Sequence, residues 1–347
     1  MINKKQISDE IILKIVDTFH DSTMLYYNSL VDEEKDNTAV TNYNLKSEHS
    51  NYYECLMEVI DAYLDFKELN TDEETNAKIQ NLFNELNDKL ENYNLTNEEM
   101  RRALLFLDIN GFKHLNFPLD YITPDVIGII CNYIVEHTVC KKEITLLDFN
   151  FGVGNLAFYL HNNLEKEVKL IGIENHSLLV NVSAHKADLM ECELSMYHQD
   201  ALEYVPSNID VVVSDIATHD YENPNYTSKL YEQGVRYFPY LVIERYLDLD
   251  NDPIYIYIID NSFFSQAGND NFKELINEQG EIISLITLPL NLFTSEENAK
   301  SILVMQKKKS KKASSSVFAL PEINNKDAFM NTMIDIIEHI NKQRNQF

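Results

Sequence analysis

The feature that most constrains the fold is a change in the periodicity of apolar residues about a third of the way along the chain. After Gly111, strand-length apolar runs alternate with segments of helical length. The runs are ITLLD (144–148), VKLIGIE (168–174), LSMYHQD (194–200), IDVVVSD (209–215) and PIYIYIID (253–260). Strands separated by helix-length segments predict a parallel sheet with helices on both faces.

Two more apolar runs follow, EIISLITLP (281–289) and SILVMQ (301–306). Only eleven residues separate them, too few for a crossover helix, so this pair is predicted to be antiparallel. The expected fold class is therefore α/β, with a seven-stranded, mostly parallel, Rossmann-like sheet and a reversed terminal hairpin. This is not the six-strand dinucleotide order. The segment 326–343 predicts a closing amphipathic helix.

Residues 1 to about 115 predict helices only, because no glycine or β-alternation interrupts them before Gly111. Thr71 with Glu74, and Thr96 with Glu99, each have the spacing of a capping box. We expect a helical N-terminal domain at 1–115 and an α/β domain at 116–347. Support, homo-oligomer formation and docking of a protein partner all remain open for the helical domain.

Charge is distributed unevenly along the 347 residues, whose formal net charge is −27. Residues 143–299 hold 26 acids and seven bases, whereas five lysines cluster in KKKSKK, from Lys307 to Lys312. An acidic body argues against tight autonomous binding to duplex DNA, because phosphate contacts need basic side chains. The lysine cluster is either a solvated loop or a contact for nucleic acid.

Four scattered cysteines, Cys55, Cys131, Cys140 and Cys192, contain no CxxC pair and predict free thiols. No apolar run reaches the roughly 20 residues of a membrane helix, and the start of the chain lacks a signal-peptide pattern. We therefore expect a cytoplasmic protein without membrane contact.

The stretch LLDFNFGVGN (146–155) ends the first predicted strand and contains two of only eight glycines. In an open parallel sheet, ligands bind beyond the carboxyl ends of the strands. Gly152 and Gly154 would allow a tight turn and close backbone approach to a ligand. Asn155, which opens the next helix, belongs to the same expected cofactor site. A GxG pair is a weak signal, since Ala157 occupies the place of a third glycine; a turn without a ligand is the alternative.

Acids end three successive strands of the predicted sheet. Glu174 follows Gly154 by 20 residues, a spacing that suits a carboxylate accepting from ribose hydroxyls. Asp200 could accept from an adenine amino group, and Asp148 could balance a positive charge. The first loop offers no lysine or arginine for a phosphate. This combination favours S-adenosylmethionine, a cationic nucleoside without phosphate, over a nicotinamide dinucleotide.

Other chemistries have little support in the sequence. The histidines do not pair with nearby carboxylates at metal-ligand spacing, so no metal is expected. Ser214 lacks the GxSxG context of a hydrolase nucleophile.

Two segments carry a family resemblance, DYITPDVIGIICNYIV (120–135) and GEIISLITLPLNLFTSEENAKSILVMQKK (280–308). Together they resemble amino-group, adenine-specific DNA methyltransferases of the type I modification-subunit kind, and more narrowly their stand-alone Firmicute branch. The resemblance covers roughly residues 115–306. It implies S-adenosylmethionine as cofactor and a nucleic-acid adenine as acceptor. Thr123 and Pro124 fit the N-cap and first position of a helix, and Thr123 joins the expected cofactor site, as does Phe151, which could cover the cofactor's ring.

That family carries an Asn/Asp-Pro-Pro-Tyr/Phe loop after the fourth strand, where oxygens hold the target amine and a ring stacks on the extruded base. This chain has SDIATHDYENP there, from Ser214 to Pro224. Asp215 matches the first position, but Ile216, Ala217 and Thr218 replace the prolines and the aromatic residue. Asp215 and Tyr221 are the predicted catalytic residues. The alternative is a non-catalytic descendant that acts through cofactor or protein binding.

Overall fold

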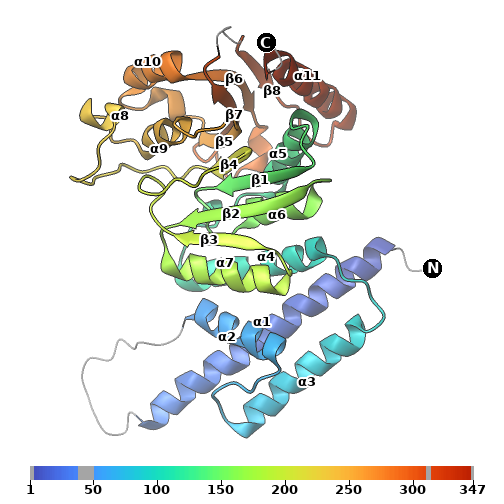
Figure 1. Cartoon of the computed structure of the whole chain (residues 1–347). Coiled ribbons are helices and arrows are strands. Elements are labelled where there is room, and N and C mark those ends of the chain that lie inside the picture. The colour runs from blue at the N-terminus through green and yellow to red at the C-terminus, as the bar shows by residue number, and fades with distance from the viewer. Residues whose placement is uncertain (1–3, 38–50, 310–313, 345–347) are drawn as a thin grey trace. The chain divides into compact units, whose positions relative to one another are not determined.

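The computed structural model describes residues 4–37, 51–309 and 314–344. It divides into two compact units, Met1–Ile122 with His176–Glu193, and Thr123–Asn175 with Leu194–Phe347. The first unit is helical and the second contains the sheet (Figure 1). The expected division after residue 115 assigned 176–193 to the second domain, whereas these residues pack with the N-terminal helices.

The helical unit is assembled around one long helix, α1 (Lys4–Asn37), which packs against α2, α3 and α4. Helix α7 packs on α2 and α4. Buried aromatic rings fill the interior, with Phe19 edge-on to Tyr63 at 5.2 Å. The bounds are α2 (Tyr52–Asp65), α3 (Glu73–Leu90), α4 (Asn97–Leu115), η2 (Leu119–Tyr121) and α7 (Ser177–Leu189).

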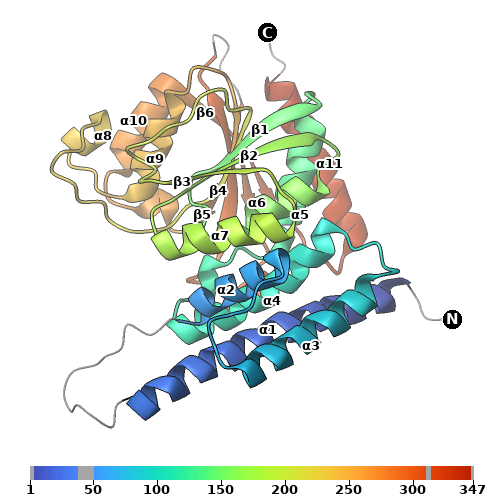
Figure 2. The same cartoon turned by 60° about the horizontal axis from the view of Figure 1, so that its bottom comes forward.

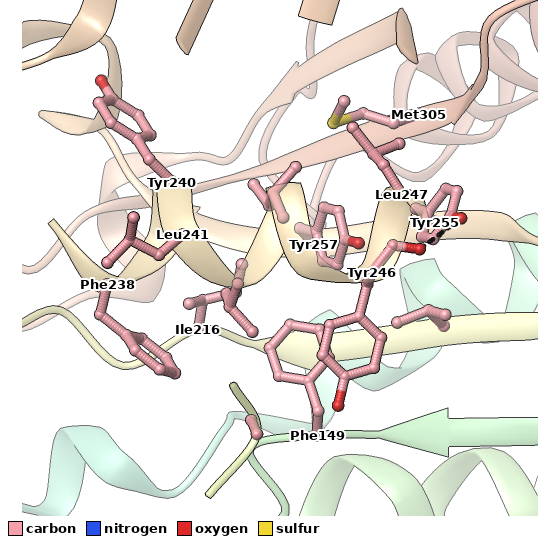
Figure 3. Packing of buried hydrophobic residues seen from close by; sticks show 14 of the residues in the cluster. Phe149, Ile216, Phe238, Tyr240, Leu241, Tyr246, Leu247, Tyr255, Tyr257 and Met305 are labelled. Atoms are coloured by element: carbon pink, nitrogen blue, oxygen red, sulfur yellow. Dashed lines mark hydrogen bonds between the residues drawn. The ribbon is translucent and has the colours of Figure 1, made fainter. Parts of the chain in front are cut away.

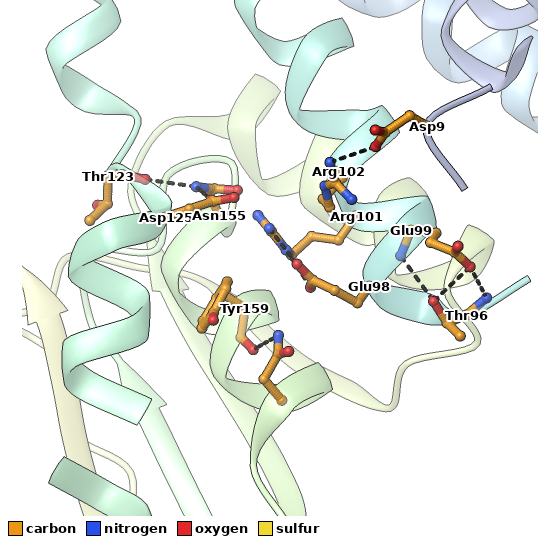
Figure 4. Close-up of polar contacts among 11 residues, drawn as sticks. Asp9, Thr96, Glu98, Glu99, Arg101, Arg102, Thr123, Asp125, Asn155 and Tyr159 are labelled. Carbon is orange, nitrogen blue, oxygen red and sulfur yellow. Dashed lines mark hydrogen bonds and ion pairs between the residues drawn. The ribbon is translucent and has the colours of Figure 1, made fainter. Parts of the chain in front are cut away.

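Of the two predicted capping boxes, one is confirmed. The Thr96 side chain accepts from the Glu99 backbone while Glu99 accepts from the Thr96 backbone, which opens α4 (Figure 4). The Thr71 box is wrong: Asp72 caps α3 by accepting from the Thr75 backbone at 2.9 Å. An aspartate one position later has a full negative charge for the helix N-terminus, and the Thr71 hydroxyl donates to Ser29 instead.

The second unit is built on one eight-stranded sheet in the order β3-β2-β1-β4-β5-β7-β6-β8. Strands β1 to β5 run parallel, and β7 is antiparallel to both β5 and β6. The strands are β1 (Glu143–Asp148), β2 (Glu167–Glu174), β3 (Leu194–His198), β4 (Val211–Asp215), β5 (Ile254–Asp260), β6 (Gly280–Thr287), β7 (Lys300–Lys307) and β8 (Ser316–Ala319). The α/β class and the reversed hairpin are confirmed.

Helices cover both faces of this sheet, as the two views in Figures 1 and 2 show. One layer holds α5 (Asp125–Thr138), α6 (Asn155–Asn163) and α11 (Lys326–Arg344), and the other holds α8 (Lys229–Glu232), α9 (Phe238–Leu247) and α10 (Asn269–Gln279). Short helical turns η3 (Phe263–Ser265) and η4 (Leu290–Leu292) follow β5 and β6.

Helix α9 is buried almost entirely, and its aromatic residues fill the space over β1, β4 and β5 (Figure 3). Tyr246 stacks on Phe149 with ring centroids 4.6 Å apart, and Phe149 also contacts Tyr257. This packing fixes the loop that begins directly after β1.

The eighth strand, β8, was not predicted from the sequence. Its four residues pair with β6 at the sheet edge, and Val317 is 70% exposed. So short an edge strand contributes almost nothing to the hydrophobic pattern. In the part of the chain that is described, no helix combines the length and apolarity needed to cross a membrane.

Candidate functional site

The loop after β1 requires glycine at two positions. Gly152 and Gly154 have φ angles of +55° and +76°, a region that side-chain-bearing residues rarely adopt. A Cβ atom on Gly154 would also lie 2.5 Å from both Phe151 and Phe158. Gly154 is the N-cap of α6, so the loop and the helix start depend on the same residue.

The loop is tied to the end of the neighbouring strand. The Gly152 backbone nitrogen donates to Glu174 Oε2 at 2.8 Å, and Glu174 is only 7% exposed. Two predicted cofactor residues, 22 positions apart, are thus brought into direct contact.

A cavity of about 140 Å³ opens beyond the carboxyl ends of β1 to β4. Its lining residues are Phe149, Asn150, Glu174, Asn175, Gln199, Asp200, Ala201, Ala217, His219, Tyr221 and Phe238. Carboxylates that can accept from hydroxyls and an amino group therefore share one cavity with aromatic rings suited to a planar base. This donor and acceptor set fits the adenosine part of S-adenosylmethionine.

Tyr221 lies on the Asp200 side of this cavity. Its hydroxyl donates to Asp200 Oδ2 at 2.9 Å, and the Leu202 backbone donates to Asp200 Oδ1 at 2.8 Å. Burial, together with the nearby carboxylate, raises the pKa of Tyr221 to about 12, so it remains a donor at neutral pH. Its predicted stacking role beside Asp215 stays a prediction.

Phe151 packs beneath the loop. It is 3% exposed, lies edge-on to Phe158 at 5.5 Å, and covers Gly172. Its expected place over a cofactor ring also stays a prediction.

Asp148 ends β1 as a buried carboxylate held by two donors. The Ser214 hydroxyl donates to Oδ1 at 2.6 Å and the Asn150 backbone at 3.0 Å. Burial, with the nearby carboxylates Asp215 and Glu174 adding to it, raises the pKa of Asp148 to about 7. Its charge therefore responds to pH and to any cation bound nearby.

Asp215 ends β4 and is held on both oxygens. Thr123 donates to Oδ2 at 2.9 Å, and the Lys300 ammonium forms an ion pair with Oδ1 at 2.7 Å. Thr123 is fixed in turn by Asn155, whose side chain donates to the Thr123 carbonyl at 2.7 Å and to Asp125 at 3.1 Å (Figure 4). Three predicted site residues, Thr123, Asn155 and Asp215, form one chain of contacts.

The expected cap of α5 needs correction. Pro124 is the N-cap and Asp125 the first helical residue, with no side-chain cap bond. The Thr123 hydroxyl is committed to Asp215 and is therefore not used for the helix start.

Several residues of the site were not proposed from the sequence. The Asn150 side chain accepts from the Ala217 backbone at 2.9 Å and joins the first loop to the loop after β4. His219 stacks on Phe238 at 4.5 Å and lines the cavity. Lys300 starts β7, in a hairpin segment that showed its apolar pattern but no sign of a contact 85 residues back in the chain.

The basic cluster is only partly described, since Lys311 and Lys312 lie outside the described residues. Lys307 and Lys308 donate to the backbone carbonyls of Leu249 and Asn277. Lys309 pairs with Asp252 at 3.2 Å. Within the described ranges, no cluster of three histidine, cysteine, aspartate or glutamate side chains could hold a metal ion.

Comparison with known proteins connects this geometry to a family. The model of the N-6 DNA methylase family matches residues 157–346, more than half of the chain. The chain belongs to the N-6 DNA methylase family. This family consists of S-adenosylmethionine-dependent methyltransferases, so the expected cofactor and reaction class are confirmed at the level of the family.

One curated protein is similar to this chain in sequence, and two solved structures are similar to it in fold. The YtxK protein of Bacillus subtilis (strain 168) is 30% identical over 202 residues, which span 56% of this chain and 61% of YtxK. A Listeria monocytogenes structure, described as a class I S-adenosylmethionine-dependent methyltransferase, is 23% identical with a TM-score of 0.80, covering 96% of this chain and 99% of its own. The type I restriction-modification methyltransferase subunit of Streptococcus thermophilus is 12% identical with a TM-score of 0.60, covering 96% and 93%.

Proposed function

We propose that this N-6 DNA methylase family member binds S-adenosylmethionine at the carboxyl edge of its sheet and methylates the exocyclic amino nitrogen of adenine in DNA. The observation that carries the proposal is the cavity in which Glu174 and Asp200 share a lining with Phe149 and Phe238. Carboxylates from the end of β2 and from the segment after β3 converge there with aromatic rings from the loop after β1 and from α9. No phosphate-binding lysine or arginine is among the lining residues.

The donor half of the site follows from these groups. When bound, S-adenosylmethionine supplies an electrophilic methyl group on a positively charged sulfur. Glu174 would accept from its ribose hydroxyls and Asp200 from its adenine amino group. The carboxylate of Asp148 would balance positive charge, and Gly152 and Gly154 allow close backbone approach.

The acceptor half centres on Asp215, which ends β4 beside Asp148 and Thr123. An amine conjugated to a ring is a weak nucleophile, so a carboxylate that accepts its hydrogen raises electron density on nitrogen. Tyr221 is the second proposed catalytic residue. Its ring would stack on the base, and its hydroxyl donates to Asp200 at 2.9 Å.

Calorimetric titration tests the donor half. We expect the wild type to bind S-adenosylmethionine and its demethylated product, and Glu174→Ala to weaken both about tenfold or more, since a charged hydrogen bond is lost. Glu222→Ala removes an exposed acid next to Tyr221 and serves as the matched control, with affinity unchanged. Absence of binding to the wild type would refute the proposal.

Transfer of a labelled methyl group to undermethylated DNA tests the acceptor half. Asp215→Ala should abolish incorporation at adenine, whereas Asp215→Asn, which keeps an acceptor oxygen, should retain part of it. The affinity for the demethylated product, which carries no charge on sulfur, should be unchanged in both variants. Wild-type protein that binds the donor but labels no adenine would contradict this half alone.

One observation favours a second candidate, a non-catalytic protein that binds the donor and acts through protein contacts. The residues that replace the family's two prolines and aromatic ring are engaged internally. The Ile216 and Ala217 backbones donate to Ile258 and Asn150, and the Thr218 hydroxyl donates to Asp260. Donor binding with no transfer to DNA or RNA would support this candidate.

The finer assignments rest on individual features. We propose the cytoplasm as location, because Cys55, Cys131 and Cys192 are buried free thiols. Lys307–Lys312 is the proposed contact to nucleic acid, and the helical unit is the proposed surface for a second copy or a protein partner.

A further inference from the structure

We propose that Lys300 is a specificity-determining residue of the acceptor site, which admits neutral ring-conjugated amines and excludes alkylammonium acceptors such as protein lysines. The proposal rests on the proposed function, in which Asp215 holds the acceptor amine next to the donor. It concerns a residue outside the loop that defines the family's catalytic motif.

Lys300 is held in place by the sheet itself. It is the first residue of β7 and pairs with Asp260 of β5 in the antiparallel ladder. Its neighbour Ala299 accepts from the Asn261 backbone at 3.0 Å. The side chain is only 18% exposed, and its ammonium lies 2.7 Å from Asp215 Oδ1. This lysine is therefore not a freely moving surface cation.

Asp215 keeps the capacity to bind a further donor. Among the described residues, Lys300 and Thr123 each take one position, on different oxygens. An ionised carboxylate offers about four lone-pair positions. A neutral amine can therefore donate one hydrogen to Asp215 without displacing Lys300.

Binding of a cationic acceptor would be opposed by electrostatic repulsion from Lys300. An alkylammonium bound to Asp215 would bring a second full positive charge within a few ångströms of the Lys300 ammonium, and like charges at that distance repel strongly in a partly buried site. Without Lys300, the carboxylates of Asp215, Asp148 and Glu174 would attract cations, as would a chain of net charge −27. Lys300 reverses that preference at the one carboxylate proposed to hold the acceptor.

The test compares two ligands that differ at the position of the transferred methyl group. S-adenosylhomocysteine has an uncharged sulfur and no group in place of the methyl, whereas sinefungin carries a protonated amine there. We expect the wild type to prefer S-adenosylhomocysteine, and Lys300→Met to lower the ratio of the sinefungin Kd to the S-adenosylhomocysteine Kd by about tenfold or more. Lys229→Met removes a lysine that pairs with Glu278 on the same unit and should leave the ratio unchanged.

A second variant shows whether the effect of Lys300→Met comes from the lost charge or from a misfolded site. Lys300→Gln is uncharged but can still donate to Asp215, and it should lower the ratio as Lys300→Met does. In a parallel assay, the wild type should label an adenine-containing oligonucleotide and not a lysine-rich peptide.

The outcomes separate the two proposals. An unchanged ratio in both Lys300 variants, or labelling of the peptide by the wild type, would overturn the role of Lys300 while leaving donor binding intact. If neither ligand binds the wild type, the proposed function falls, and the specificity role falls with it.

Discussion

Two lysine–aspartate pairs, one in each unit, show different uses of the same interaction. In the helical unit, Lys186 of α7 pairs with Asp108 of α4, and the side chains are 3% and 1% exposed. At the edge of the sheet, Lys300 pairs with Asp215, with side chains 18% and 11% exposed. The first pair is closed off from solvent, whereas the second borders the site where a ligand is proposed.

The surroundings of the two pairs explain the difference. Tyr53 also donates to Asp108 at 3.1 Å, so this carboxylate is enclosed by protein donors. Burial raises the pKa of Asp108 and lowers that of Lys186, and the contact between the two groups opposes both shifts, with Tyr53 and Arg101 also lowering the pKa of Asp108. Near Asp215, the buried Asp148 has a pKa of about 7. The Asp108 carboxylate has its ion-pair partner within the helical unit, whereas the raised pKa of Asp148 at the sheet edge would be lowered by a cation bound next to it.

The largest effect is expected where the closed pair is broken. Lys186→Met leaves Asp108 buried without its partner and should lower the free energy of unfolding by about 3–5 kcal/mol. Urea denaturation followed by circular dichroism measures it. The double variant Lys186→Met with Asp108→Leu should recover most of the loss, because two apolar side chains then replace two charges. If Lys186→Met is as stable as the wild type, the buried pair does not differ from the more exposed pair in its contribution to stability.

The next effect concerns Asp148 and depends on pH. Its pKa is about 7 in the folded protein, against about 3.9 in an unfolded chain. Between these values the folded state retains a proton that the unfolded state has lost, so stability falls as pH rises through this window. Asp148→Asn keeps an acceptor for Ser214 and removes the titration. Relative to the wild type, it should gain about 2–3 kcal/mol between pH 5 and pH 8, measured as urea midpoints. A stability difference between Asp148→Asn and the wild type that stays constant from pH 5 to pH 8 would contradict the raised pKa of Asp148.

A smaller effect is expected from a substitution in the loop after β1. Gly154→Ala adds a Cβ atom 2.5 Å from two phenylalanine rings at a φ of +76°. Gly234 has a φ of +88° with open space where a Cβ atom would lie. Gly234→Ala therefore measures the cost of the positive φ angle without steric crowding. Gly154→Ala should be about 1–3 kcal/mol less stable than Gly234→Ala and should also bind the donor more weakly. Equal thermal unfolding of the two variants would exclude steric crowding in the loop.

The smallest effect on stability is expected for an ion pair that is exposed to solvent. Lys78 and Glu74 form a pair one helical turn apart on α3, with side chains 55% and 79% exposed. Solvent screens such a pair, so Lys78→Ala should leave the urea midpoint within experimental error. A large loss there would mean that burial does not separate the ion pairs of this protein.

The sequence predicted much of the fold because the responsible signals are local. Alternation of apolar runs predicted the strands from β1 to β7, and the short link between β6 and β7 predicted their reversal. Strand β8 and the cap of α3 were missed or misassigned, since a four-residue edge strand and two adjacent capping candidates carry weak local signals. The sequence placed Gly152 and Glu174 in one expected site without predicting the hydrogen bond between them. Asn150 and His219 gave no sign of their contacts.

The sequence by itself indicated seven of the eight strands, the carboxyl edge of the sheet and the acids at or just beyond the ends of β1 to β4, because period-two hydrophobicity and strand ends are properties of neighbouring residues. Only the tertiary structure decided what each acid contacts. Nothing in the sequence around Lys186 and Lys300 indicates that their environments differ. The fold buries Lys186 against Asp108 and brings Lys300 to Asp215. Burial and partner distance fix the energy of a charge, and both arise only when distant segments pack together.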